Sequence, residues 1–142
     1  FIDQHRLLLV GDVATYIISV DDGAAFCTIP YAGLTLAYAD TASEYAALIF
    51  SINPVNDTYR MIIADKNGSL IADQVFTANI SQLSVYEDYV YLLTESGIAR
   101  IQPQTLSHDF IKCSTQGKSI LIPKEDEVLL CGGQSAIYYQ FD

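Results

Sequence analysis

The residue types that could carry out catalysis are scarce in this sequence. A serine–histidine–acid relay needs a histidine, and the chain has two, His5 and His108. The run Ser107-His108-Asp109 contains all three residue types. Neighbouring residues on a strand point to opposite faces, however, so these three side chains cannot act on one another. We therefore interpret the run as part of a polar hairpin and predict no catalytic residue.

Metal ligands are no better organised. Asp21-Asp22-Gly23 and Asp65-Lys66-Asn67-Gly68 offer oxygen ligands, but neither run has the alternating acids and distal glutamate of a calcium loop. Three widely separated cysteines, Cys27, Cys113 and Cys131, form no CxxC pair, which argues against zinc and against a disulfide framework. We predict no metal and no cofactor. Each cysteine is interpreted as a small buried strand residue. A disulfide between Cys27 and Cys113 is kept as an alternative.

The charge of the chain limits its partners. Seven basic residues against 17 acidic ones give a net charge of -10. Such a chain repels the phosphates of nucleic acids and of anionic lipids, so neither is an expected partner. The longest apolar stretch, residues 45–52, is too short to cross a membrane. Proteins and peptides, cationic ones included, are permitted.

Apolar runs recur about every forty residues, starting at Arg6, Tyr45, Tyr89 and Glu127. Each run is followed by a turn of breaker residues and a second apolar run. A third run follows in the first three units, after Asp-Gly, Asn-Gly or Pro-containing turns, and a shorter fourth run leads into the next unit. The pattern predicts about fourteen short strands in the chain.

Four-stranded units at this spacing are typical of a β-propeller. We predict an all-β fold of antiparallel four-stranded blades in a partial ring of about three to three and a half blades. The units are 1–33, 34–78, 79–116 and 117–142, within a single domain, 1–142, that we expect to be an excerpt of a longer chain. The first unit supplies strands two to four of its blade, and the last ends after its third strand. A β-sandwich is the alternative, but it gives no reason for the repeated order.

One segment could instead be helical. Residues 40–52, DTASEYAALIFSI, could form a short helix with Thr41 or Ser43 as its N-cap. Phe50, Ile52 and the register of the repeat favour a strand. The chain also has ten tyrosines. Some of them (Tyr86, Tyr89, Tyr91, Tyr138 and Tyr139) could either line a recognition surface or pack between blades.

The segment YVYLLTESGIARIQPQTLSHDFIKC, residues 89–113, resembles a blade of the quinoprotein-like and WD40-like propellers. The chain has no tryptophan, so the closing tryptophan of the quinoprotein repeat and the tryptophan–aspartate dipeptide are both absent. The resemblance implies a ring of seven or eight blades. It also implies an alternative function, as a fragment of a quinoprotein-like oxidoreductase or of a propeller glycoside hydrolase. A further similarity, to uncharacterised propeller domains of bacterial envelope proteins, implies an extracytoplasmic location.

In this family the loops from second to third strands and from fourth to first strands share one face. Carried onto this sequence, the resemblance makes the polar loop residues of that face binding candidates: Asn53, Asn56, Asp57, Glu95, Ser96 and Gln116. The function that we predict is a non-catalytic scaffold that binds a protein or another ligand through these loops. Because half a ring would leave apolar blade faces open, we also expect self-association.

Overall fold

The computed structural model describes residues 2–31, 33–42 and 44–142, and these residues form fourteen β-strands and no helix. Sheet A contains β1 (Arg6–Val10), β2 (Ala14–Ser19) and β3 (Ala25–Pro30). Sheet B contains β4 (Thr35–Thr41), β5 (Tyr45–Asn53), β6 (Thr58–Asp65) and β7 (Leu70–Thr77). Sheet C contains β8 (Ile80–Tyr86), β9 (Tyr89–Thr94), β10 (Gly97–Ile101) and β11 (His108–Lys112). Sheet D contains β12 (Ser119–Lys124), β13 (Glu127–Cys131) and β14 (Ala136–Gln140).

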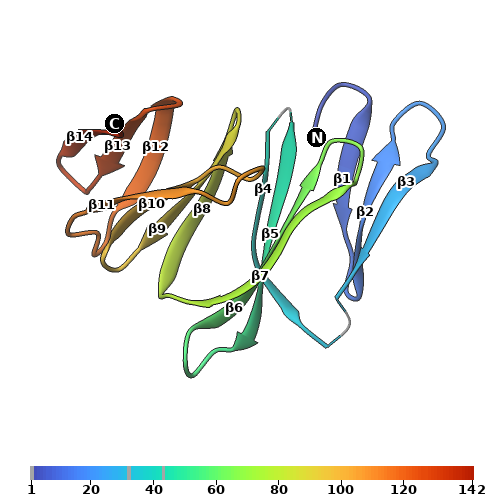
Figure 1. Cartoon of the computed structure of the whole chain (residues 1–142), viewed down its shortest axis with the longest axis horizontal. Helices are drawn as coiled ribbons and strands as arrows, with labels where there is room; N and C mark the ends of the chain where they lie inside the picture. The colour runs from blue at the N-terminus through green and yellow to red at the C-terminus, as the bar shows by residue number, and fades with distance from the viewer. Residues whose placement is uncertain (1, 32, 43) are drawn as a thin grey trace.

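Every sheet is an antiparallel meander in which each strand pairs with its neighbours in the chain. Figure 1 shows the four sheets following one another in chain order, from the blue sheet A at the right to the red sheet D at the left. The first strands of sheets B, C and D lie side by side, with β8 between β4 and β12. Sheet A therefore contains the counterparts of the second to fourth strands, and sheet D the counterparts of the first three, as the sequence predicts.

The hydrophobic core is divided into three layers, one between each pair of consecutive sheets. Ile17 and Ile29 of sheet A meet Leu48 and Phe50 of sheet B in the first layer. The second layer joins sheets B and C, and the third joins sheets C and D. Since a strand's side chains alternate between its two faces, a strand inside the stack must be apolar at every position. This explains why β5 is buried at each of its first six residues.

The first strands are also linked by polar contacts. The backbone N–H of Val85 in β8 donates to Oδ2 of Asp40 in β4, at 2.8 Å. The side-chain amide of Gln82 in β8 bonds both backbone groups of Ile120 in β12, at 2.9 and 2.7 Å. These bonds replace the ladder bonds that strands of different sheets cannot make, and they fix the spacing of sheets B, C and D.

The meander places the connections at two opposite ends. One end, called the connector face here, has the turns from second to third strands and the links between sheets. Its described residues are 11–13, 31, 33–34, 54–57, 78–79, 95–96, 113–118 and 132–135. The other end, called the opposite face, has the remaining turns and the N-terminal segment. Its described residues are 2–5, 20–24, 42, 44, 66–69, 87–88, 102–107 and 125–126.

Two sequence-based interpretations need correction or completion. The helical alternative for residues 40–52 is wrong, because Asp40 and Thr41 end β4 and Tyr45 begins β5; Ser43, the other proposed cap, lies outside the described residues. The three cysteines are free thiols and half-buried, so they are less buried than expected. Cys113 also follows β11 instead of lying within a strand. No Cys27–Cys113 disulfide is formed.

Candidate functional site

An open depression of about 580 Å³ lies on the connector face, where the end of sheet C meets the start of sheet D. Three elements form it: the start of β8, the β9–β10 turn and the link from β11 to β12. The residues that line it are mostly polar and none is aromatic: Asn79, Ser81, Glu95, Ser114, Thr115, Gln116, Gly117 and Lys118.

The link from β11 to β12 is held against sheet C by buried hydrogen bonds. The hydroxyl of Thr115, which is 5% exposed, donates to the carbonyl oxygen of Thr94 at 2.6 Å. The N–H of Lys118 donates back to the carbonyl oxygen of Thr115 at 3.0 Å, which closes a tight turn. Gly117 occupies the left-handed region within this turn, with φ of 67°. The wall of the depression is therefore fixed by backbone geometry and is independent of its exposed side chains.

Four side chains of the depression are available to a ligand: Asn79, Glu95, Ser114 and Gln116. The backbone N–H of Glu95 donates to the carbonyl oxygen of Asn79 at 3.1 Å, which holds both residues in place. Within the described part of the chain, the side chains of Asn79, Glu95 and Gln116 bond to no other protein group. The ammonium of Lys118 donates to the carbonyl oxygen of Ser114 at 2.7 Å. One carboxylate, two amides and the hydroxyl of Ser114 thus remain to bind a partner.

Two of the six predicted residues, Glu95 and Gln116, line this depression together. Ser96 lies beside it in the β9–β10 turn, and its hydroxyl is 3.3 Å from the hydroxyl of Thr94. Asn79, Ser114 and Lys118 were not predicted. The signal for them would have been the six residues between β11 and β12, a link long enough to form a wall.

Asn53 ends β5 of sheet B, and Asn56 and Asp57 lie in the β5–β6 turn at the same face. Asn53 accepts the N–H of Val55 on its side-chain oxygen at 3.0 Å, so this amide shapes its own turn. Asp57 has φ of 48° and accepts the N–H of Ala78 on its carbonyl oxygen at 3.1 Å. These three residues extend the face across sheet B, and none of them lines the depression.

A second depression, of about 370 Å³, lies on the same face between sheets A and B. It is formed by the corresponding elements, the β1–β2 turn and the link from β3 to β4. Asp12 takes the place that Glu95 has in sheet C. The hydroxyl of Tyr31 donates to the carbonyl oxygen of Gly11 and accepts from the hydroxyl of Thr15. The repeat thus places an acidic turn residue beside each of the two depressions.

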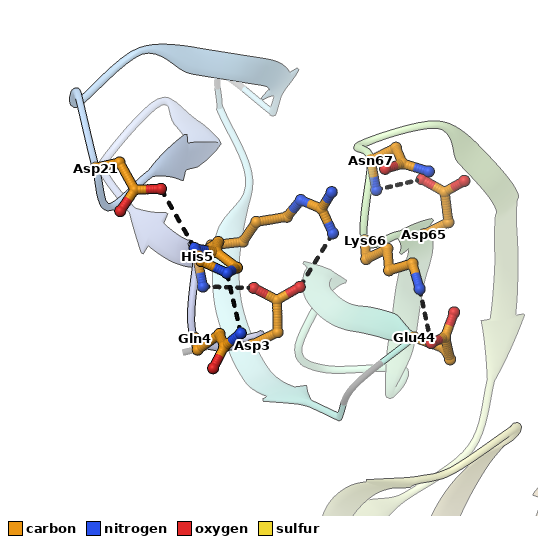
Figure 2. Close-up of polar contacts among 9 residues, drawn as sticks. Asp3, Gln4, His5, Asp21, Glu44, Asp65, Lys66 and Asn67 are labelled. Atoms are coloured by element: carbon orange, nitrogen blue, oxygen red, sulfur yellow. Dashed lines mark hydrogen bonds and ion pairs between the residues drawn. The ribbon is translucent and has the colours of Figure 1, made fainter.

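Several carboxylates at the end of sheets A and B on the opposite face are engaged in contacts (Figure 2). His5 lies 3.3 Å from Asp21, and the ammonium of Lys66 lies 2.9 Å from Glu44. Asp65 accepts the N–H of Asn67 at 2.8 Å, as expected for a turn-forming aspartate. These contacts stabilise the turns and occupy the carboxylates that make them.

Arg100 is an internal cation that sequence analysis missed. It is 7% exposed, and its guanidinium lies 4.9 Å from the ring centre of Tyr89 and 4.5 Å from that of Phe141. Asp109, part of the run that could suggest a catalytic relay, accepts a hydrogen bond from it at 2.6 Å. Asp109 is therefore a structural partner of a buried arginine, and Arg100 ties sheet D to sheet C.

The tyrosines of sheet C pack between sheets. Tyr91 is fully buried in the third core layer, with Tyr86 and Tyr89 packed against the same layer. The hydroxyl of Tyr91 donates to the carbonyl oxygen of Glu125, and burial raises the pKa of this phenol. Tyr139 packs on this layer as well, whereas Tyr138 is 51% exposed. Tyr86, Tyr89, Tyr91 and Tyr139 therefore pack between sheets C and D.

Neither the cysteines nor the acidic side chains assemble a reactive centre in the described ranges. Burial raises the pKa of Cys27 and of Cys113, which keeps these thiols protonated and weakly nucleophilic. Among the described residues no group of three or more His, Cys, Asp or Glu is placed to hold a metal ion. The described residues form no helix of the length and apolarity needed to span a bilayer.

No family model matches the chain, and no curated protein matches it. Solved structures do share its fold. HIRA(644–1017) aligns with 92% of this chain and 43% of its own, at a TM-score of 0.64. The fold is that of a β-propeller. BamB from Moraxella catarrhalis aligns with 98% of this chain and 43% of its own, at 0.51. PorZ is an essential bacterial surface component of the type IX secretion system of Porphyromonas gingivalis. It aligns with 99% of this chain and 20% of its own, at a TM-score of 0.50.

Sequence identity is 12% in all three cases, so the likeness concerns the fold alone. The chain spans less than half the length of each of these propeller structures. Its four sheets correspond to blades, and because sheets A and D lie at opposite ends of the row, the ring is partial. The quinoprotein-like and WD40-like resemblance of the sequence is supported at the level of fold, and no match of sequence identifies one family.

Proposed function

We propose that this propeller segment is a non-catalytic recognition module that binds a protein partner through its connector face. The observation that carries the proposal is the depression between sheets C and D. Its walls are fixed by buried hydrogen bonds, while Asn79, Glu95 and Gln116 are free to bond outward. A rigid backbone removes the entropy cost of ordering the loops when a partner binds.

The composition of the face favours a protein or peptide over other ligands. A net charge of -10 opposes phosphate-rich partners. Besides the depression, the face offers Asn56 and Asp57 on the β5–β6 turn and the exposed Val55 at its tip, which is 87% exposed. A mixture of amides, carboxylates and scattered apolar side chains is typical of protein interfaces.

The proposal predicts the site of selected binders. Random peptides displayed on phage are selected on the 142-residue chain, and their affinities are measured for a triple variant, Asn56→Ala with Ser96→Ala and Gln116→Ala. We expect most selected peptides to bind this variant at least about tenfold more weakly, because truncating central interface residues removes most of the binding energy.

A matched control variant has the same residue types changed on the opposite face: Gln4→Ala, Ser69→Ala and Asn67→Ala, the first and last of which appear in Figure 2. Binding to this control should change by less than about twofold, since residues outside an interface contribute little. Selected peptides that lose affinity for the control variant, or no binders above background, would contradict the proposal.

We also propose that the chain self-associates through the open faces of its end sheets. Leu8 packs into the first core layer, so Leu9 points to the outer face of sheet A, where it is 49% exposed. On sheet D, Leu121, Leu129 and Tyr138 are in register on the outer face, and Leu121 is 61% exposed. Both faces have the aliphatic character of the faces that meet inside the molecule, so a second copy can cover them.

In sedimentation equilibrium, the mass of the chain should therefore rise with concentration. Leu121→Lys should keep the chain close to monomeric, because a buried unpaired ammonium opposes association. Val75→Lys, an equivalent change on the outer strand β7 where Val75 is 63% exposed, serves as the control and should leave association intact. A constant monomer mass at every concentration would contradict the proposal.

An extracytoplasmic location is also proposed, on the similarity of the sequence to envelope propeller domains. In support, PorZ, one of the structures with this fold, is described as a bacterial surface component. Antibodies raised against the chain should label intact cells of the producing organism, and labelling that requires permeabilised cells would contradict this location.

A further inference from the structure

We propose that the depression between sheets C and D binds a cationic side chain, lysine or arginine, presented by an extended segment of a partner protein. This inference rests on the proposed function and names the group that the connector face recognises. The carboxylate of Glu95 would pair with the cationic group, and the amides of Asn79 and Gln116 line the same depression.

The depression holds one carboxylate, Glu95, and one ammonium, Lys118, and the two differ in their hydrogen bonds. Lys118 is the basic residue of the lining, and its ammonium is directed to the carbonyl oxygen of Ser114, 2.7 Å away. One hydrogen bond of this ammonium is therefore already made within its own loop. The carboxylate of Glu95 has no such partner among the described residues. A ligand that brings its own ammonium or guanidinium gains a charge-assisted hydrogen bond there.

The neighbouring groups suit the head of such a side chain. Amide oxygens of Asn79 and Gln116 accept hydrogen bonds, and an ammonium or guanidinium has several donors to distribute. A depression of about 580 Å³ that is open to solvent accommodates a long side chain while the partner's backbone stays at the surface. An aromatic platform, which sugar or base stacking would use, is absent from the residues that line it.

A metal ion fits the same residues poorly. Calcium takes six to eight oxygen ligands, usually from several carboxylates. The lining offers a single carboxylate, and no group of three His, Cys, Asp or Glu in the described ranges is placed around an ion. An organic cation needs only one carboxylate.

The repeat supplies an independent observation. The corresponding depression between sheets A and B also has one acidic residue on its β1–β2 turn, Asp12. Its lining also includes three aliphatic residues, Val10, Leu34 and Leu36, whereas the lining of the first depression has none. The connector face therefore presents an acidic turn residue at each of these two depressions.

The test uses defined probes on the 142-residue chain. Acetyl-Gly-Lys-Gly-amide and acetyl-Gly-Arg-Gly-amide are titrated at low ionic strength, with neutral acetyl-Gly-Gln-Gly-amide as the control probe. The observables are the side-chain NH₂ resonances of Asn79 and Gln116 and the backbone resonance of Glu95. We expect saturable shifts with the cationic probes and binding at least about tenfold weaker with the neutral probe, because the charge-assisted bond is lost.

Two charge-matched variants complete the design. Glu95→Gln should weaken binding of the cationic probes by about tenfold, because it removes the acceptor charge and keeps the shape. Glu125→Gln removes one exposed carboxylate of the opposite face and should leave binding within about twofold, since distant surface charges are weakly coupled to the site. The probe series is informative even if one variant fails to fold.

Equal shifts for charged and neutral probes, shifts spread evenly over all exposed acidic residues, or equal losses in the two variants would each overturn the inference. The proposed function has a separate readout. If selected peptides lose affinity for the Asn56/Ser96/Gln116 variant but not for Glu95→Gln, the connector face is the binding surface and the cation site is wrong. If they lose affinity for neither, the proposed function fails as well.

Discussion

Leu48→Ala and Ile49→Ala are each expected to lower the free energy of unfolding by about 2–5 kcal/mol, although the two residues are adjacent in β5. Adjacent residues of a strand face opposite sides of its sheet. Leu48 is 1% exposed in the layer between sheets A and B, and Ile49 is 0% exposed in the layer between sheets B and C. In a two-layer sandwich one of the two would face solvent, so a large loss at both positions distinguishes stacked blades from a sandwich.

Urea unfolding followed by circular dichroism measures both changes. Leu70→Ala is the matched control, because Leu70 begins the outer strand β7 and is 56% exposed. Its loss should stay within about 0.5 kcal/mol, as for other surface positions. A small effect at either Leu48 or Ile49 would show that one face of sheet B is uncovered in solution.

The order of strands was predictable because its determinants are local. Apolar runs, breaker turns and their spacing follow directly from the sequence, and they predict the strands and their division into units. The turn at Glu95-Ser96 shows this well. Thr94 ends β9 and Gly97 begins β10, as the repeat register predicts. The resemblance to propeller blades then implies that Glu95 lies on the face that has the turns from second to third strands.

The depression itself was only half predictable. Glu95 and Gln116 could be assigned to one face because they belong to turns of known type. Asn79 and Ser114 become neighbours of Glu95 only through the position of the β11–β12 link, which Thr115 fixes with its bond to Thr94. A side-chain-to-backbone bond across twenty-one residues leaves no periodic trace in the sequence. Residues that meet through such bonds must be read from coordinates.

Arg100 illustrates the same limit for a buried charge. Its sequence context, GIARIQ, gives no sign that a cation is buried, and basic residues are usually exposed. Burial is possible because Asp109 pairs with it across β10 and β11, while Tyr89 and Phe141 cover the guanidinium. The partners come from sheets C and D, so the arrangement exists only once the sheets are stacked. Sequence analysis interpreted Asp109 as part of a polar hairpin and did not find its contact with Arg100.

Gly68→Ala is expected to destabilise the chain by about 2–4 kcal/mol, more than the same change at any exposed turn. Gly68 lies in the β6–β7 turn of sheet B with φ of 84°, a conformation that disfavours a side chain. An added Cβ would also lie 2.0 Å from Cβ and 2.9 Å from Sγ of Cys27, in β3 of sheet A. Two sheets approach each other at this point closely enough to exclude a methyl group.

Gly33→Ala separates the two causes. Gly33 has the same φ of 84°, yet an added Cβ there would meet nothing within 4 Å. Gly33→Ala should therefore lower the free energy of unfolding by only about 1 kcal/mol, the strain of placing alanine in the left-handed region. In both variants alanine also restricts the unfolded chain, and this stabilising effect is the same for the two. The difference between the two losses in urea unfolding then measures the contact between sheets A and B alone. Equal losses would mean that the sheets separate at this turn in solution, and the first core layer would then be looser than the others.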